Sequence, residues 1–172
     1  QWLRSGPRSS AENPLGSTTH ISVLDADGMA ASLTMSNGEG CGHVLPGLGI
    51  HMNNFLGEAD INPTGFHSLE AGVRMTTMMA PTIATTAGVP RLVLGSGGSN
   101  RIRSVVLQVL LNRIGFGLPI QDSIDAARCH IEGDRLWFEQ HGLTPEVVAR
   151  LKTMREHVAV FEEPHMYFGG VH

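Results

Sequence analysis

The chain has 172 residues, which is the size of one ordinary domain. Hydrophobic residues make up 41% and charged residues 16%, so a core is available and intrinsic disorder is a poor description. The formal net charge is -4 and there is no basic run, which argues against nucleic acid as a partner. No stretch approaches the roughly 20 consecutive apolar residues that cross a bilayer, so we expect no membrane span.

The first seventeen residues differ in composition from the rest. They are rich in Gly, Pro, Ser and Asn and have no helical or strand periodicity, which predicts a flexible segment over 1–17 and an ordered domain over 18–172. The chain starts without Met and without the layout of a signal peptide. We therefore expect it to be a piece of a longer polypeptide.

Two hairpins are predicted in the first half of the domain. The first joins strands over 19–25 and 29–36 through Ala26-Asp27-Gly28. The second joins strands over 81–84 and 91–94 through Ala87-Gly88. Between them we expect a glycine-rich loop, a short strand over 49–53 and a long ordered loop over 54–72.

The second half is predicted to be mainly helical. A helix follows the turn Gly95–Asn100, with Asn100 as its cap and apolar residues on one face as far as Ile114. A second helix is expected over 120–129, and a third from the cap Thr144 and Pro145 to about Met154. A final strand is expected over 166–168. Strands and helices are then segregated, which favours a layered α+β fold over a doubly wound sheet.

Thr18 is the first candidate for chemistry, because Thr18-Thr19-His20 lies where the flexible segment meets a strand. A threonine hydroxyl becomes a useful nucleophile when a nearby base takes its proton, and its own α-amine can do so once the preceding peptide bond is cut. The α-amine has a pKa near 7.7 to 8.0, so a useful fraction is neutral at physiological pH. The alternative is that these are ordinary strand threonines.

The glycine-rich turn Gly95–Asn100 is the second candidate. Successive backbone N–H groups before a helix can stabilise a negative oxygen. The turn lacks the ending of a P-loop and the third glycine of a dinucleotide fingerprint, which argues against nucleotide binding. An oxyanion site and a purely structural turn both remain open.

The cysteines and histidines suggest no metal or redox site. Cys41 and Cys129 match no metal or redox spacing and are interpreted as two small buried thiols. The nine histidines do not form the paired spacing of a zinc site. We therefore expect no metal and no cofactor.

A series of segments in a fixed order resembles the small subunit of γ-glutamyltranspeptidases. The segments are TTHISVLDADG (18–28), SLTMSN (32–37), GIHMNN (49–54), RMTTMMAPTI (74–83), LVLGSGGSNRI (92–102) and LQVLLN (107–112). The resemblance covers about residues 18–170. It identifies the chain as a divergent member of that family.

The resemblance implies an N-terminal nucleophile hydrolase with a four-layer αββα sandwich, of which this chain supplies the catalytic small-subunit half. The precursor would cut itself between Ser17 and Thr18. The freed Thr18 would attack a γ-glutamyl amide, and water or an amine would resolve the acyl-enzyme. Family small subunits usually continue beyond Gly170, so the C-terminal end is expected to be truncated or shorter here.

The resemblance also assigns individual roles. Ser36 corresponds to the hydroxyl residue that anchors the new amino terminus, and Asn37 stands near the substrate-contacting asparagine. The N–H groups of Gly98 and Ser99 match the oxyanion turn. Glu58 aligns with the acidic residue that binds the donor's α-amino group. Thr77 and Met78 align with a Ser-Ser pair that binds its α-carboxylate.

The sequence departs from the family pattern at three positions. Phe55 replaces a polar residue, Met78 replaces a hydroxyl, and Ser99 replaces the second glycine of the turn. Methionine cannot donate a hydrogen bond to a carboxylate, so the γ-glutamyl specificity is less secure than the hydrolase machinery. An amidase for another N-acyl substrate is therefore an alternative.

The resemblance implies partners as well. We expect a large subunit from the same precursor, a small γ-glutamyl donor, and a periplasmic or extracellular location. The competing hypothesis is a catalytically silent homologue that acts as a binding or scaffold protein, which would follow if Thr18 stays blocked.

Overall fold

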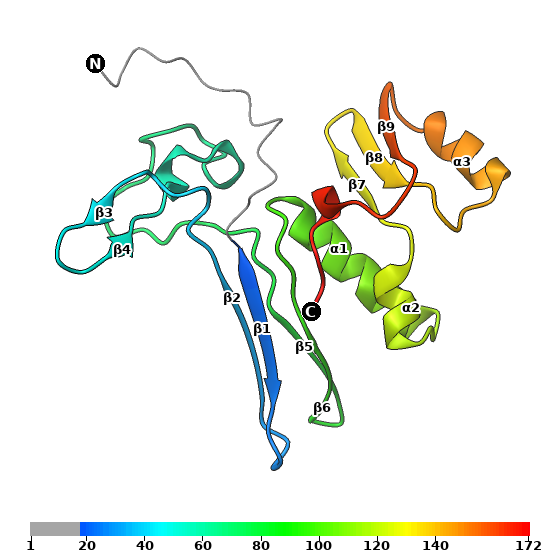
Figure 1. Ribbon diagram of the computed structural model, residues 1–172, viewed down its shortest axis with the longest axis horizontal. Helices are drawn as coiled ribbons and strands as arrows, with labels where there is room; N and C mark the ends of the chain where they lie inside the picture. The colour runs from blue at the N-terminus through cyan, green and yellow to red at the C-terminus, as the bar shows by residue number, and fades with distance from the viewer. Residues whose placement is uncertain (1–17) are drawn as a thin grey trace.

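The computed structural model describes residues 18–172 (Figure 1). The flexible segment predicted over 1–17, with Ser17 of the expected cleavage site, lies outside the described residues. The described part combines helices with small sheets, in agreement with the predicted α+β class. None of its helices is long and apolar enough to span a bilayer.

The first predicted hairpin is confirmed. Strand β1 (Thr19–Leu24) pairs antiparallel with β2 (Ala30–Met35), and Thr19 lies opposite Met35. The Asp25 carboxylate closes the turn by accepting the N–H groups of Asp27 and Met29 at 3.0 and 2.8 Å.

The two faces of this hairpin differ in burial. His20 of β1 is buried on the face that meets β6. Because side chains alternate along a strand, the opposite face carries a different set of residues. These are Ile21, Val23, Leu33 and Met35, which are 44 to 52% exposed. We call this set the outer apolar face.

The glycine-rich segment forms a small hairpin of its own. Strand β3 (Val44–Leu45) pairs with β4 (Ile50–His51), so the strand predicted over 49–53 is shorter than expected and its partner was missed. Two 3₁₀ turns follow, at Phe55–Gly57 and Ala59–Ile61, within the loop expected over 54–72.

The second predicted hairpin is also confirmed. Strand β5 (Thr82–Thr86) pairs antiparallel with β6 (Val89–Leu94). Ala87 and Gly88 form the turn with φ values of 51° and 80°. Paired left-handed conformations match the right-handed twist of the flanking strands.

Helix α1 (Arg101–Leu110) follows the glycine-rich turn and ends in a π-helical turn at Leu111–Gly115. The predicted apolar face is buried at Ile102, Val105, Val106 and Val109, but Ile114 at its predicted end is 65% exposed. Asn100 precedes the helix, but its side chain does not cap it. The amide nitrogen donates to Glu132 at 2.7 Å, and the amide oxygen accepts from Arg101 at 3.0 Å. Because the Asn100 side-chain oxygen accepts from Arg101, it does not accept a backbone N–H as a helix cap would.

The three-stranded sheet is the main element that the sequence missed. Strand β7 (Cys129–Glu132) pairs antiparallel with β8 (Arg135–Glu139), and β8 pairs in parallel with β9 (His157–Phe161). Helix α2 (Ile120–Asp125) therefore ends before Cys129, which belongs to β7 rather than to a helix. Strands and helices are thus less segregated along the chain than predicted.

Helix α3 (Pro145–Lys152) begins as predicted, because Thr144 Oγ1 accepts the N–H of Val147 at 3.5 Å. The strand predicted over 166–168 is wrong. Met166–Phe168 is a 3₁₀ turn in which the Phe168 N–H donates to the carbonyl of His165 at 3.2 Å.

The core lies where α1 meets the end of β6 and the C-terminal segment (Figure 1). Phe168 is fully buried there, and Trp137 of β8 packs against the same cluster. The buried members are Leu94, Ile102, Val105, Val106, Val109, Phe168 and Val171. This packing brings β1, at the start of the described chain, and residues 165–172, at its end, to the glycine-rich turn Gly95–Asn100.

Candidate active site

Thr18 stands directly before β1, and the hairpin register places it beside Ser36 at the end of β2. The Thr18 hydroxyl donates to Ser36 Oγ at 3.0 Å. Ser36 Oγ also accepts the N–H of Gly38 at 2.9 Å. The predicted nucleophile and its predicted anchor are therefore brought together.

The glycine-rich turn lies against Thr18. A Cβ at Gly97 would stand 2.9 Å from the Thr18 carbonyl oxygen and 3.5 Å from the Thr18 Cβ. Only glycine permits this approach, since a Cβ contact below 3.0 Å forces the backbone to move. The two candidate features of the sequence are thus neighbours in space.

The next two residues of the turn have left-handed backbones, with φ of 126° at Gly98 and 55° at Ser99. Their carbonyls accept the N–H groups of Arg101 and Ile102. Within residues 18–172, neither the N–H of Gly98 nor the N–H of Ser99 donates a hydrogen bond. The start of α1 adds a positive field there, which favours a negatively charged oxygen.

Ser99 takes a conformation that favours glycine, at the position where the resemblance expects one. Its hydroxyl donates to Asp60 Oδ2 at 3.3 Å. The serine therefore ties the turn to the 3₁₀ segment that carries Asp60.

Asn37 is turned to a different partner. Its amide donates to the carbonyl of His51 at 3.2 Å, and the side chain is exposed. Asn54, which the sequence analysis did not select, accepts the N–H of Glu39 at 2.9 Å. The Asn53-Asn54 pair after a short strand is the sequence pattern that could have indicated Asn54.

Glu58 lies over Gly38, where any side chain would meet its carboxylate. Burial raises the pKa of Glu58 above its ordinary value, and the carboxylates of Glu39 and Asp60 raise it further, while a backbone hydrogen bond at Glu39 opposes them. Repulsion among three carboxylates would be relieved by a cation. Glu58 is therefore placed to meet a positive group beside Gly38, whose N–H donates to Ser36 Oγ.

Thr77 and Met78 do not form a pair of hydroxyl donors. Thr77 Oγ1 accepts the N–H of Met79 at 3.1 Å, and Met78 packs against the hydrophobic core. An apolar residue suits that location, which gives a physical reason for the departure from the family pattern.

His20 is a buried polar residue two positions after Thr18 whose function the sequence did not indicate. Its ring nitrogens lie 2.7 Å from Thr34 Oγ1 and 3.0 Å from Ser22 Oγ. Gly95 of the turn packs against the ring so closely that a Cβ there would clash with it. His20 thus joins β1 to the glycine-rich turn.

We expect His20 to make the fold acid-sensitive. Burial lowers the pKa of His20 below its ordinary value of 6.5, and His172 lowers it further. The unfolded chain therefore binds protons more readily, so this stability is complete above about pH 6.5 and is lost as the pH falls through the folded pKa. Denaturant unfolding at pH 7 and pH 5 should show the loss. His20→Asn should flatten the difference while costing about 1–3 kcal/mol at pH 7; an unchanged pH slope would contradict the assignment.

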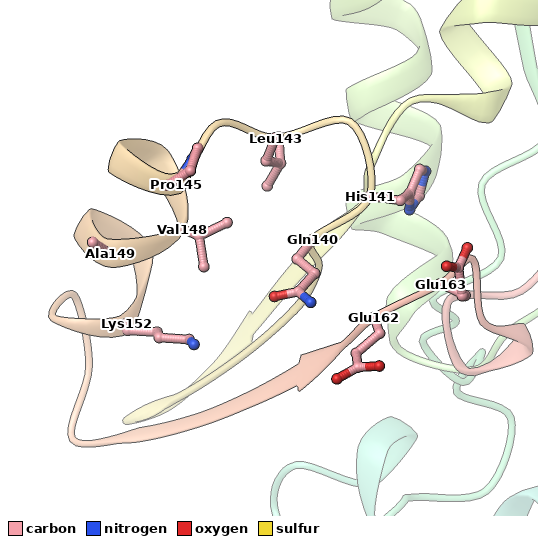
Figure 2. Close-up of a pocket in the computed structure, with 9 residues that line it drawn as sticks. All are labelled: Gln140, His141, Leu143, Pro145, Val148, Ala149, Lys152, Glu162 and Glu163. Carbon is pink, nitrogen blue, oxygen red and sulfur yellow. The ribbon is translucent and has the colours of Figure 1, made fainter.

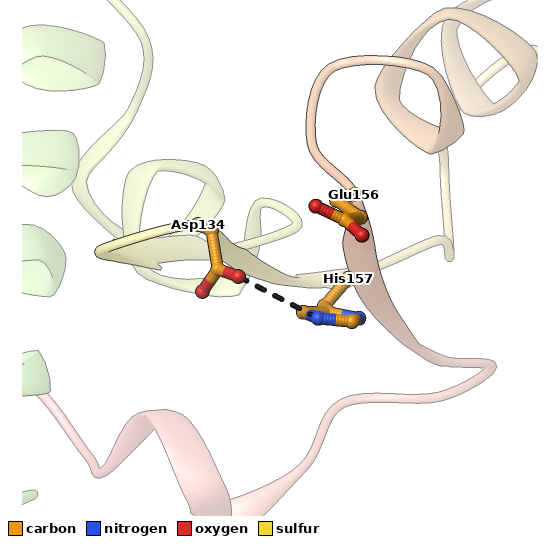
Figure 3. A group of neighbouring side chains, drawn as sticks. All are labelled: Asp134, Glu156 and His157. Atoms are coloured by element: carbon orange, nitrogen blue, oxygen red, sulfur yellow. Dashed lines mark ion pairs between the residues drawn. The ribbon is translucent and has the colours of Figure 1, made fainter.

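The cysteines and the acidic surface add no catalytic group. Cys41 is exposed, so its interpretation as a buried thiol is wrong, whereas Cys129 is half-buried and burial raises the pKa of its thiol. Asp134, Glu156 and His157 lie close together on the surface (Figure 3), and His157 already pairs with Asp134 at 3.5 Å. We interpret this group as an exposed ion pair.

A groove of about 550 Å³ opens between α3 and the ends of β8 and β9 (Figure 2). Val148 and Lys152 of α3 line it on one side, and Gln140 and Glu162, which follow β8 and β9, line it on the other. Neither Thr18 nor the Gly95–Asn100 turn contributes to that groove.

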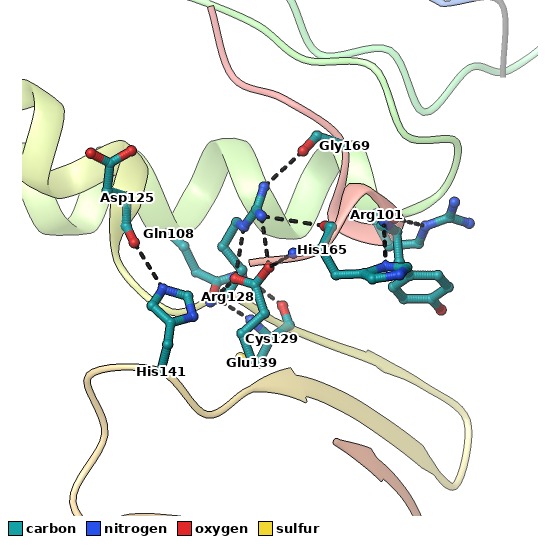
Figure 4. A network of polar contacts seen from close by, with 10 residues as sticks. Arg101, Gln108, Asp125, Arg128, Cys129, Glu139, His141, His165 and Gly169 are labelled. Carbon is teal, nitrogen blue, oxygen red and sulfur yellow. Dashed lines mark hydrogen bonds and ion pairs between the residues drawn. The ribbon is translucent and has the colours of Figure 1, made fainter. Parts of the chain in front are cut away.

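A buried ion pair that the sequence did not indicate lies beside the core (Figure 4). Arg128 and Glu139 approach to 2.7 Å, and the Glu139 side chain is fully buried. Arg128 precedes β7 and Glu139 ends β8, which were not predicted as strands. The pairing was therefore invisible in sequence.

Comparison with known families identifies the class of protein. The model of the family described as "Gamma-glutamyltranspeptidase" matches residues 3–172. The chain belongs to the γ-glutamyltranspeptidase family.

Particular relatives refine this class. The glutathione hydrolase proenzyme of Pseudomonas aeruginosa is 32% identical over 153 residues, which cover 80% of this chain and 28% of the proenzyme. The acylase ACY 1 proenzyme of Pseudomonas sp. strain SE83 is 35% identical over 145 residues, which cover 83% and 26%. The chain thus spans about a quarter of the length of these curated relatives.

Solved structures give the same result for the fold. The γ-glutamyltranspeptidase of Pseudomonas nitroreducens in complex with L-DON matches with a TM-score of 0.72 and 30% identity, covering 89% of this chain and 86% of that one. The transpeptidase CapD of Bacillus anthracis matches with a TM-score of 0.67 and 29% identity, covering 89% and 83%. The chain therefore shares the fold of these transpeptidase chains.

Proposed function

We propose that this chain is the catalytic small-subunit part of an N-terminal nucleophile hydrolase that transfers or hydrolyses γ-glutamyl groups. The observation that carries the proposal is the position of Thr18. Its hydroxyl is 3.0 Å from Ser36 Oγ, and its backbone contacts the turn at Gly97. Neighbouring residues would thus supply a nucleophile, an anchor and two oxyanion donors.

Self-cleavage would come first. Thr18 Oγ attacks the carbonyl carbon of Ser17, the peptide C–N bond breaks, and the acyl group passes to the hydroxyl as an ester. Water then hydrolyses the ester, which leaves a carboxylate on Ser17 and a free α-amine and hydroxyl on Thr18. The α-amine is the base that later catalysis needs.

Turnover would use the same atoms. The α-amine takes the proton of Thr18 Oγ as the oxygen attacks the γ-carbonyl of the donor, and it returns the proton to the departing amine. Water or an acceptor amine then attacks the acyl-enzyme and restores the hydroxyl. The N–H groups of Gly98 and Ser99 would stabilise the oxyanion, and losing one such donor typically costs about 2.7–4 kcal/mol.

Donor recognition would rest on Glu58. Its half-buried carboxylate, with Glu39 and Asp60 nearby, suits the α-ammonium group of a γ-glutamyl donor. Met78 offers no donor for the α-carboxylate, so that contact would need another residue. A large subunit from the same precursor is the proposed source.

The outer apolar face supports this partner and the four-layer αββα sandwich. It consists of Ile21, Val23, Leu33 and Met35, each about half exposed on one side of the β1–β2 hairpin. A second apolar layer would bury it, since sheets that pack face to face interdigitate such side chains.

The full-length precursor tests the function with two chromogenic anilides. A γ-glutamyl anilide carries the α-amino group, whereas a glutaryl anilide of the same chain length lacks it. We expect Thr18-dependent release from the γ-glutamyl compound, with kcat/KM at least about tenfold higher than for the glutaryl compound, which corresponds to about 1.4 kcal/mol. Release from neither anilide would favour a silent binding or scaffold homologue.

A second candidate function is an amidase for a different N-acyl group. The specific observation is Met78, which packs against the core where a carboxylate-binding hydroxyl is expected, and the similarity to the acylase proenzyme agrees with it. Preference for a butyryl anilide, which lacks both the α-amino group and the carboxylate, would support this candidate.

Replacement of Met78 provides a direct check. Met78→Ser should lower the KM for both the γ-glutamyl and the glutaryl anilide, because each carries a carboxylate to which a hydroxyl can donate, and should leave the KM for a butyryl anilide, which lacks that carboxylate, unchanged. The lost packing should also reduce stability by about 2 kcal/mol. Steady-state kinetics and denaturant unfolding measure both effects, and an equal fall in the KM for the butyryl anilide would argue against a carboxylate contact at this position.

A further inference from the structure

Ser99 has a backbone conformation that favours glycine. Its φ of 55° lies in the left-handed region, which costs an L-residue energy that glycine avoids. A strained residue persists where its surroundings favour it, and such residues often serve a function. The hydroxymethyl group is all that serine adds to glycine, so the gain must come from the contacts of that group.

The Ser99 hydroxyl reaches a segment that is distant in the sequence. It donates to Asp60 Oδ2 at 3.3 Å. Within residues 18–172, the Asp60 carboxylate makes no other hydrogen bond and no ion pair. The contact with Ser99 therefore fixes the direction of this carboxylate.

Asp60 belongs to the same piece of chain as Glu58, and we call this piece the donor segment (residues 55–62). Its two 3₁₀ turns are closed around Asn62, which is 6% exposed. The Asn62 amide nitrogen donates to the carbonyls of Phe55 and Glu58 at 2.8 and 2.7 Å. A buried amide with two partners holds the segment as one unit, so a shift of Asp60 carries Glu58 with it.

The donor segment meets the other half of the site through Glu58. The Glu58 carboxylate lies over Gly38, whose N–H donates to Ser36 Oγ at 2.9 Å. Ser36 Oγ also accepts the Thr18 hydroxyl at 3.0 Å. The donor segment therefore contacts the residues beside the nucleophile at one end and the glycine-rich turn, through Ser99, at the other.

In the proposed function, Glu58 would bind the α-ammonium group of the donor, and the N–H groups of Gly98 and Ser99 would stabilise the oxyanion at its γ-carbonyl. We propose that Ser99 and Asp60 are positioning residues, whose hydrogen bond fixes the distance between Glu58 and this oxyanion site. The pair then selects donors by the number of atoms between the ammonium group and the scissile carbonyl. This selection rests on the proposed function, whereas the coupling of the donor segment to the turn does not.

Two anilides measure the selection in the full-length precursor. A γ-glutamyl anilide and a β-aspartyl anilide carry the same α-ammonium and α-carboxylate groups, and they differ by one CH₂ between these groups and the scissile carbonyl. We expect wild type to prefer the γ-glutamyl compound at least about tenfold in kcat/KM, since one methylene typically changes discrimination by about 10- to 200-fold. A change of charge alone affects both compounds equally, so the ratio reports the spacing.

Three single variants separate the hydrogen bond from the charge. Ser99→Gly removes the hydroxyl, keeps the backbone N–H and suits the left-handed conformation, so its denaturant midpoint should stay close to that of wild type. Asp60→Ala removes the acceptor, whereas Asp60→Asn removes the charge and keeps an oxygen acceptor. Gln121→Ala removes an exposed hydrogen bond of 2.8 Å to Asp125 and is the matched control.

We expect the preference for the γ-glutamyl anilide to fall at least about fivefold in Ser99→Gly and in Asp60→Ala, which is the order of effect of one hydrogen bond. The double variant should fall no further than either single variant, because both changes remove the same contact. Asp60→Asn should keep the preference within about twofold. Amide hydrogen exchange of peptides covering 55–62 should rise at least about threefold in Ser99→Gly and Asp60→Ala. The control should match wild type in both measurements.

An unchanged preference in Ser99→Gly, or equal rates on the two anilides in wild type, would overturn the selection of donors. Equal losses in Asp60→Asn and Asp60→Ala would overturn it as well, since the charge and not the hydrogen bond would then be responsible. Additive losses in the double variant, or unchanged exchange at 55–62, would overturn the coupling. If wild type has no Thr18-dependent activity on either anilide, the proposed function fails, and the exchange measurement alone decides whether Ser99 and Asp60 couple the donor segment to the turn.

Discussion

Thr18→Ala in the full-length precursor should leave the Ser17–Thr18 bond intact and reduce γ-glutamyl anilide hydrolysis by about three orders of magnitude or more. The variant removes the oxygen that attacks in both steps. Because the Ser17–Thr18 bond stays uncut, the α-amine that would act as base is not released. Intact-mass spectrometry after prolonged incubation measures cleavage, and the anilide assay measures turnover.

Two variants sharpen this test. Thr18→Ser keeps a hydroxyl and should retain slower cleavage and turnover, whereas Thr85→Ala removes an exposed strand threonine from β5 and should behave as wild type. Cleavage of the Thr18→Ala protein at the normal site, or its full activity, would eliminate Thr18 as the nucleophile.

Gly97→Ala should reduce self-cleavage and kcat by about 100-fold, because small misplacements of reacting groups have effects of that size. The added Cβ would stand 2.9 Å from the Thr18 carbonyl oxygen, so either the turn or the nucleophile must move. The affected atoms are backbone atoms with few alternative positions.

Gly115→Ala is the matched glycine control. Its Cβ would meet nothing within 4 Å, so stability should change by no more than about 0.5 kcal/mol and activity should not change. Single-turnover release of the anilide and the denaturant midpoint distinguish a local from a global effect. Equal behaviour of the two alanine variants would mean that contact between Thr18 and the turn is not required.

The part of the site on the first hairpin could be predicted from local signals. Ala26-Asp27-Gly28 fixes the turn, and the register that follows places Thr18 beside Ser36. The residue types of a turn and the alternation of side chains along a strand involve only a few neighbouring residues, so both can be predicted from the sequence.

The contact between Thr18 and Gly97 is not indicated by any turn residue or alternating pattern in the sequence. Seventy-nine residues separate the two positions, and only the family resemblance suggested that they act together. Their contact depends on packing between β1 and β6 and on the absence of a side chain at Gly95 and Gly97. Hydrophobic patterns do not specify contacts of that kind.

The sheet of β7, β8 and β9 was missed for a related reason. Cys129–Glu132 is a short run whose helical and strand patterns are equally good, and β9 joins β8 only after α3 intervenes. Glu139 reads as an ordinary charged residue until that sheet buries it. Roles that depend on long-range burial therefore had to come from the structure.

The outer apolar face has a practical consequence for recombinant work. A hairpin with aliphatic and thioether side chains in contact with water invites self-association through the same hydrophobic effect that would drive correct assembly. Residues 18–172 produced in isolation should therefore form aggregates in the cell, whereas translation as one continuous precursor would let that surface find its cover before it meets a neighbouring copy.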